Sequence, residues 1–184
     1  SLYQVRAAGS SRRLYTDGVL HTQYNPRRIA TGSVWDLLWL PVFFGPAPRV
    51  ERALVLGVGA GAVIRQLDSL FQPREIVGVE NNPVHLQVAR EFFGVTAKMA
   101  ALHLSDASEF VYRYRGVGFD LVIDDLFSAS GGIPRRAVLC DHHWMKQLVR
   151  HLADDGVLCV NFADRWEFRT APFSAWFGSN RRFC

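Results

Sequence analysis

A glycine-rich turn and an acidic residue downstream have the types and the spacing of a nucleoside-binding site. Gly57, Gly59 and Gly61 follow a short apolar run and open a helical segment, so the backbone there can turn sharply and approach a ligand without an intervening Cβ. Glu80 stands nineteen positions after Gly61, at the end of the next predicted strand. A carboxylate at that distance can accept hydrogen bonds from both ribose hydroxyls of a nucleoside. The alternative for Glu80 is an ordinary solvated carboxylate at a strand end.

Further aspartates end the next two predicted strands. Asp106 follows the strand 102–104, and Asp124 and Asp125 follow the strand 119–123. Ligands of open α/β sheets bind beyond the carboxyl ends of the strands, so these side chains are expected in the same crevice as Glu80. The run 106–109 also has the form of a helix capping box, which is compatible with a ligand contact. Of Asp124 and Asp125, we expect one to face the pocket and the other the solvent.

The elements that position these residues alternate in the βαβ manner. Short apolar runs bounded by turn residues predict strands at 53–56, 75–79, 102–104, 119–123 and 157–162, with helices at 62–71, from 83 to Gly94, from 106 and from about 141. This alternation predicts an α/β fold with a Rossmann-like, doubly wound, mostly parallel sheet over residues 46–184. Residues 163–184 have no clear periodicity, and one expectation is that the last strands of such a sheet are missing.

Residues 1–45 are predicted to form a separate N-terminal segment. Two β-prone runs flank Asp17-Gly18, a hairpin signal over 14–21, and a helix is expected from Ser33 to Leu40. Its aromatic residues, with those that follow, either wall a substrate pocket or pack in the core; these are Trp35, Trp39, Phe43 and Phe44. Farther along, residues 128–132 are small, and either a lid over the site or a plain surface loop is expected there.

Composition narrows the class of protein. The chain has 184 residues, a formal charge of +4, a hydrophobic fraction of 49% and three scattered cysteines without C-x-x-C spacing. These values predict a globular cytoplasmic protein with buried free thiols, no structural metal and no disulfide framework. The apolar run at 34–44 is too short to span a membrane. The arginine pairs are dispersed along the chain, so nucleic acid is not an expected partner.

From Tyr3 to Asn161 the sequence resembles the polyamine (spermidine/spermine) synthase-like group of class I methyltransferase-fold proteins. The resemblance rests on the segments 14–18, 54–61 with Arg65, 79–80, 105–107 with Phe110, 119–125 and 155–158. It implies that the glycine turn holds the amino-acid or aminopropyl end of S-adenosylmethionine or of its decarboxylated form. It further implies that Glu80, with Asn81 beside it, binds the ribose and that Asp106 and Ala107 bind the adenine. Asp125 then takes the place of the carboxylate that activates the attacking amine.

The sequence departs from that group where the amine would bind. The group carries Gly-Gly-Gly-Asp-Gly-Gly in the turn, where this chain has Ala60 in place of the aspartate. Its Tyr-Gln-Glu segment is matched here by the stretch 33–36, and its Asp-Ser-Ser-Asp-Pro by Asp125-Leu126-Phe127-Ser128. A polycation needs several carboxylates and other acceptors to replace water, so the cofactor half of the site is kept and the amine half is not.

These observations order the functional hypotheses. An S-adenosylmethionine-dependent methyl transfer to an unidentified small-molecule acceptor comes first, and aminopropyl transfer from decarboxylated S-adenosylmethionine to a diamine comes second. A catalytically silent nucleoside-binding scaffold is the third, and a nicotinamide-binding protein ranks below these. A homodimer is left open.

Overall fold

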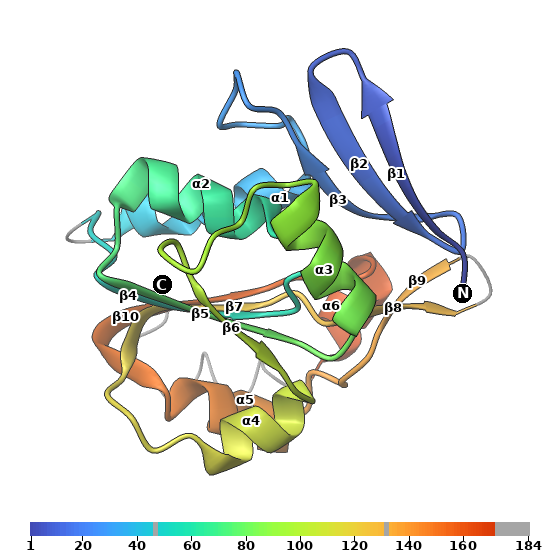
Figure 1. The fold of residues 1–184 in the computed structure, drawn as a ribbon. Helices are drawn as coiled ribbons and strands as arrows, with labels where there is room; N and C mark the ends of the chain where they lie inside the picture. Colours follow the sequence, from blue (N-terminus) through green and yellow to red (C-terminus); the bar gives the residue numbers. More distant parts are fainter. Residues whose placement is uncertain (46–47, 131–132, 172–184) are drawn as a thin grey trace.

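Short apolar runs in the middle of the chain pair into a parallel sheet with the strand order β10-β7-β4-β5-β6, drawn in Figure 1 from the computed structural model. The structure describes residues 1–45, 48–130 and 133–171. The strands are β4 (Arg52–Leu56), β5 (Glu75–Glu80), β6 (Ala101–Leu104), β7 (Phe119–Asp124) and β10 (Leu152–Val160). The chain runs outward from β4 through β5 to β6, and then returns to the other side of β4 with β7. The strand order therefore reverses at β4 and β7, where ligands of such sheets bind.

Helices cover both faces of this sheet, and a side chain caps the start of three of them. Figure 1 shows α2 (Ala62–Phe71) and α3 (Pro83–Glu91) on one face, and α4 (Ala107–Arg113) and α5 (His142–Val149) on the other. The side chains of Asn82, Asp106 and Asp141 accept hydrogen bonds from backbone N–H groups in the first turns of α3, α4 and α5. The predicted Rossmann-like α/β class, with its mostly parallel sheet, is confirmed.

The N-terminal segment forms a three-stranded antiparallel sheet of β1 (Tyr3–Ala8), β2 (Ser11–Thr16) and β3 (Val19–Tyr24). The predicted hairpin is confirmed, because Asp17 and Gly18 form its turn with φ values of 50° and 82°. β1 was not among the predicted strands, although Tyr3, Val5 and Ala7 alternate with Gln4 and Arg6; its residues are half-buried or exposed. The division of the chain near residue 45 stays a prediction. β3 packs directly on the turn after β4, where the Thr22 hydroxyl accepts a hydrogen bond of 2.8 Å from the Ala60 N–H.

The predicted helix over 33–40 is shorter than expected. Helix α1 covers only Val34–Leu37, and a 3₁₀ helix, η1, covers Leu40–Phe44. Pro41 explains the break, because a proline ring clashes with the carbonyl group four residues earlier in an α-helix, here that of Leu37.

Two regions near the sheet edge also differ from expectation. Of the stretch 128–132, expected as a lid or loop, residues 128–130 belong to β8 (Phe127–Ser130), which pairs antiparallel with β9 (Ile133–Arg136); residues 131–132 lie outside the described part. The predicted strand 157–162 is β10, which begins at Leu152 and is irregular between Leu152 and Val157. The tail forms helix α6 (Arg165–Thr170); the rest of it, with Cys184, lies outside the described residues.

Three further expectations can be compared with the described residues. Cys140 and Cys159 are buried free thiols, as predicted. Within 1–45, 48–130 and 133–171, no three His, Cys, Asp or Glu side chains are grouped so that they could hold a metal ion. In the same ranges no helix has the length and apolar character needed to cross a membrane.

Candidate functional site

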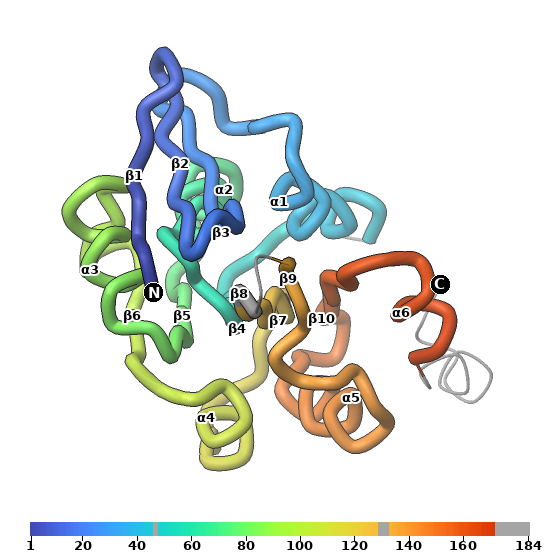
Figure 2. The backbone as a smooth tube through the Cα atoms, turned by 90° about the vertical axis from the view of Figure 1, so that its right-hand side faces the viewer, coloured from blue at the N-terminus to red at the C-terminus, as the bar shows by residue number. Residues whose placement is uncertain are grey.

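A cavity of about 460 Å³ lies over the carboxyl ends of the strands. Figure 2 looks toward this edge of the sheet, where β7 leads into the β8–β9 hairpin. Of the residues that the sequence predicted for the site, seven line the cavity: Gly57, Gly59, Glu80, Asn81, Asp106, Ala107 and Asp125. Gly61 is not among the lining residues. A Cβ at Gly61 would lie 2.5 Å from the Val95 side chain, so this glycine serves close packing of α2 in the core.

Glu80 is tied to the glycine turn by hydrogen bonds. Its Oε2 atom accepts from the N–H groups of Val58 (3.1 Å) and Gly59 (2.9 Å), and its Oε1 atom accepts from the Asn82 N–H (2.9 Å). Burial alone would raise the pKa of Glu80, but the hydrogen bonds around it, first from His85, hold that pKa below its ordinary value. A carboxylate has about four lone-pair positions, and these donors engage both oxygens of Glu80, so Glu80 has a structural task at the glycine turn that its spacing in the sequence did not reveal.

Two histidines lie beside Glu80 and were missed from the sequence. His21 on β3 and His85 on α3 both line the cavity, with their ring centroids 5.0 Å apart. His85 Nε2 is 2.9 Å from the Thr16 hydroxyl, and its Nδ1 is 3.8 Å from Glu80 Oε1. Burial, reinforced by His85, lowers the pKa of His21 to about 4, so this imidazole is neutral at pH 7. No sequence signal joins β3 to α3, because their contact exists only after the N-terminal sheet docks.

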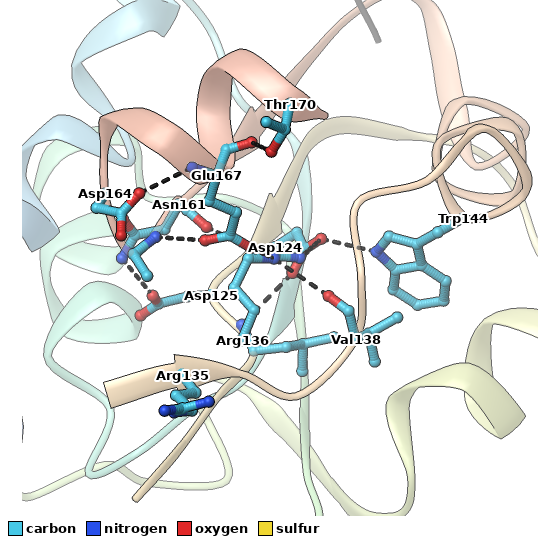
Figure 3. A network of polar contacts seen from close by, with 12 residues as sticks. Asp124, Asp125, Arg135, Arg136, Val138, Trp144, Asn161, Asp164, Glu167 and Thr170 are labelled. Carbon is cyan, nitrogen blue, oxygen red and sulfur yellow. Dashed lines mark hydrogen bonds and ion pairs between the residues drawn. The ribbon is translucent and has the colours of Figure 1, made fainter. Parts of the chain in front are cut away.

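The adjacent aspartates at the end of β7 have different surroundings, drawn in Figure 3. Asp125 lines the cavity, and its Oδ1 accepts a hydrogen bond of 2.7 Å from Asn161 Nδ2. Burial, partly offset by Asn161, raises the pKa of Asp125 to about 6. Asp124 is fully buried, so the expectation that one of the two faces solvent is wrong. Neighbouring residues of a strand point to opposite faces, and Asp124 is thereby directed under α5, where Trp144 Nε1 donates to it at 2.7 Å.

Arg136 is a buried hub that joins both aspartates. Its guanidinium forms an ion pair of 2.7 Å with Asp124 and a second, of 3.3 Å, with Glu167. It also donates to the backbone carbonyl of Asn161, whose side chain binds Asp125. Figure 3 shows this hub between the end of β9 and the start of α6. Because Arg136 neutralises Asp124, Asp125 is the carboxylate of this pair that is left for a ligand.

The aromatic cluster that follows the N-terminal sheet separates into different environments. Trp35 and Trp39 are both buried in the core, and Trp35 also lines the cavity. Phe43 and Phe44 are exposed, by 46% and 82%. The interpretation as core packing therefore holds for both tryptophans, and the interpretation as a pocket wall holds for Trp35.

The charge of the cavity wall is entirely acidic. Glu80, Asp106 and Asp125 line it, and none of its lining residues, which all belong to the described part of the chain, is Lys or Arg. Such a wall favours a positively charged ligand over one that carries a carboxylate or phosphate.

Comparison with known proteins places this geometry in context. Residues 36–170 match the family model described as the spermine/spermidine synthase domain. The polyamine aminopropyltransferase 2 of Caldanaerobacter subterraneus subsp. tengcongensis is 28% identical over 149 residues, which cover 75% of this chain and 47% of that protein. The chain spans about half the length of the curated relatives it matches.

Solved structures share the fold. A probable spermidine synthase from Corynebacterium glutamicum aligns with a TM-score of 0.70 at 17% identity, covering 86% of this chain and 59% of that one. A spermidine synthase in complex with the transition-state analogue AdoDATO aligns with a TM-score of 0.61 at 15% identity, covering 90% of this chain and 59% of that one.

Proposed function

The chain belongs to the spermine/spermidine synthase family, and we propose that it transfers an aminopropyl group from decarboxylated S-adenosylmethionine to an amine. The observation that carries this choice is the acidic cavity wall, with Glu80, Asp106 and Asp125 and without a Lys or Arg among its lining residues. S-adenosylmethionine ends in a carboxylate, whereas the decarboxylated form ends in an aminopropyl ammonium group. The second fits a wall of carboxylates better, because opposite charges attract and like charges repel across a poorly solvated cavity.

The roles proposed for the residues follow from where they lie. Glu80 and Asn81 at the end of β5 hold the ribose, and Asp106 and Ala107 at the start of α4 hold the adenine. Gly57 and Gly59 line the cavity beside them, where the donor's sulfonium end is proposed to lie. Their missing side chains let Asp125 and Thr22 pack against the turn, because a Cβ would lie 2.2 Å from the Asp125 carbonyl oxygen at position 57 and 2.5 Å from the Thr22 hydroxyl at position 59. These positions follow one edge of the sheet, so a single nucleoside can contact all of them.

The transfer itself is a displacement at carbon. The amine nitrogen attacks the methylene carbon next to the donor's sulfonium; the new C–N bond forms while the C–S bond breaks, and the electron pair stays on sulfur as a neutral thioether. Asp125 accepts the proton that the amine loses. Its pKa of about 6 leaves it mostly ionised at pH 7 and suited to act as general base. Holding donor and amine together contributes much of the acceleration.

This proposal reverses the order of the two enzymatic hypotheses derived from the sequence. The sequence favours methyl transfer because its amine-binding motifs differ from those of the polyamine synthase group. The family match and the acidic cavity support aminopropyl transfer instead. Methyl transfer and the silent scaffold become alternatives that one experiment separates.

The experiment compares three ligands by calorimetry and then follows transfer. Decarboxylated S-adenosylmethionine should bind at least about tenfold more tightly than S-adenosylmethionine, and incubation with amines should release methylthioadenosine. Asp125→Asn should keep donor binding within a few fold and lose the release. Tighter binding of S-adenosylmethionine together with methylation would support methyl transfer. No heat with either donor or with methylthioadenosine would support the scaffold.

A further inference from the structure

The end of the cavity that would receive the amine is apolar. The proposed adenosine contacts lie at the ends of β5 and β6, so the amine is expected on the opposite side of β4, near β7, α1 and the β8–β9 hairpin. Figure 2 shows β7 and α1 on the side of β4 away from β6. The apolar residues that line this end are Val34, Trp35, Phe127, Pro134, Val138 and Phe162. Its polar side chains are Ser33, Asp125 and Asn161. Asp125 is therefore the carboxylate that faces an amine at this end.

Asp36 lies near this end but is directed away from it. Its carboxylate accepts hydrogen bonds from the Thr31 N–H (2.9 and 3.0 Å), the Thr31 hydroxyl (3.0 Å), the Gly32 N–H (2.7 Å) and Gln66 Nε2 (2.6 Å). Burial works in the opposite direction, but these donors hold the pKa of Asp36 below its ordinary value. Asp36 does not line the cavity. It closes the 31–36 loop on α2 and leaves no oxygen for a ligand.

Two further carboxylates nearby are paired with Arg136. Asp124 and Glu167 both pair with its guanidinium, at 2.7 and 3.3 Å, and neither lines the cavity. The residues outside the described part of the chain, 46–47, 131–132 and 172–184, contain no Asp or Glu in their sequence. The chain thus supplies one carboxylate to the amine and none to a second ammonium group farther along it.

We propose that the acceptor is a primary amine on an apolar carbon chain or ring, with a single positive charge, rather than a di- or polyamine. This inference rests on the proposed aminopropyl transfer. A second ammonium group would enter a mostly apolar wall in which the lining residues offer it no second carboxylate, and burying a charge without a charged partner is unfavourable. A hydrocarbon tail gains instead, by about fourfold in affinity for each buried methylene.

A matched pair of amines tests this. Butylamine and 1,4-diaminobutane have the same carbon chain and differ in the second amino group, and hexylamine adds two methylenes to the first. With saturating decarboxylated S-adenosylmethionine, methylthioadenosine release should give a higher kcat/KM for butylamine than for diaminobutane. Hexylamine should exceed butylamine by about 15-fold, which is fourfold for each of its two additional methylenes.

The outcomes distinguish this inference from the function on which it rests. A tenfold preference for diaminobutane over butylamine would overturn the inference and leave aminopropyl transfer intact. Donor binding without release from any of the three amines would also overturn the inference. Absence of donor binding in calorimetry would overturn the proposed function itself.

A substitution that adds a carboxylate at the amine end gives a second test. Ser33 lines the amine end and is the N-cap of α1, yet its side chain makes no capping hydrogen bond. Aspartate is favoured at an N-cap, so Ser33→Asp adds a carboxylate at little cost in folding. It should raise the ratio of kcat/KM for diaminobutane to that for butylamine at least about tenfold. Ser69→Asp, on an exposed position of α2 away from the cavity, should leave the ratio unchanged, and equal ratios in the two variants would contradict the inference.

Discussion

The backbone carbonyl of Asp125 occupies the place where a side chain on Gly57 would begin. A Cβ at position 57 would lie 2.2 Å from that oxygen, and Gly57 has a φ of +86°. The Asp125 N–H also donates to the Leu56 carbonyl at 2.9 Å. The end of β7 is therefore held against the turn after β4, and the missing side chain at Gly57 sets how close the proposed base lies to the proposed donor site.

Gly57→Ala should destabilise the fold and abolish donor binding, because the new Cβ must displace the Asp125 backbone. Gly18→Ala is the matched control, since Gly18 has a φ of +82° but nothing within 4 Å of its Cβ position. The control carries only the backbone strain, about 1 kcal/mol, and should bind donor normally. Urea unfolding and calorimetry measure both effects. Equal losses of stability in the two variants would show that the contact with Asp125 has no energetic importance.

We expect the ion pair of Arg136 with Asp124 to contribute more to the free energy of unfolding than any surface ion pair of this protein. Arg136→Met leaves Asp124 as a fully buried charge with Trp144 Nε1 and the Leu126 N–H as its remaining donors, and breaking such a pair costs about 3–5 kcal/mol. Adding Asp124→Asn removes the stranded charge, so the double variant should recover at least about 1 kcal/mol. Urea denaturation of the two single variants and the double variant gives the coupling. A loss below about 1 kcal/mol in Arg136→Met would contradict the role of this hub.

The sequence was sufficient for the parallel sheet and for much of the cavity wall. Buried strands such as β4 are continuous apolar runs, and Gly57, Glu80 and Asp106 follow the ends of such runs, where ligands of these sheets bind. Local chemistry decided those elements, so the pattern predicted them. The cap at Asp106 is a further local signal that the structure confirms.

The remainder depends on contacts between distant residues. His21 meets Glu80 only because β3 packs on the turn after β4, and Arg136 meets Asp124 only because the β8–β9 hairpin folds back over β7. No periodicity encodes such contacts. Asp124 shows the consequence: it was expected in solvent or in the pocket, and its partners on β9 and α5 instead make it the most buried acid of the network.

His21 should make the fold sensitive to acid. Its pKa of about 4 in the folded state lies below the ordinary value of 6.5, so the folded protein binds fewer protons between these values. The free energy of unfolding is therefore unaffected by His21 above pH 6.5 and decreases as the pH falls toward 4. Between pH 7 and pH 5 the loss amounts to about 2 kcal/mol.

His21→Phe keeps a ring against His85 and removes the titrating group, so its free energy of unfolding should fall less between pH 7 and pH 5 than that of the wild type. Urea titrations at the two pH values give the comparison. The exposed His143 offers a control, since His143→Phe should leave the pH dependence as it is. An unchanged pH dependence in His21→Phe would show that its imidazole does not titrate in this window.

Asp125 should have the opposite dependence on pH, and its replacement should separate stability from activity. Its pKa is raised from 3.8 to about 6 in the folded protein, so the folded state binds more protons between these values. Stability is then greatest below pH 3.8 and decreases as the pH rises through 6, by an amount on the order of 1–3 kcal/mol at pH 7. That amount is the cost of keeping a charged base in the cavity wall.

Asp125→Asn removes this cost while its side-chain oxygen can still accept the hydrogen bond from Asn161. The variant should therefore unfold at higher urea than the wild type at pH 7, with the difference vanishing near pH 4, while methylthioadenosine release falls at least about 100-fold. Asp120→Asn is the contrasting variant, because Asp120 accepts hydrogen bonds from the Glu51 and Arg52 N–H groups and should lose stability at pH 7. If Asp125→Asn is instead less stable than the wild type at pH 7, Asp125 is a structural carboxylate and the proposed base must be sought elsewhere in the cavity wall.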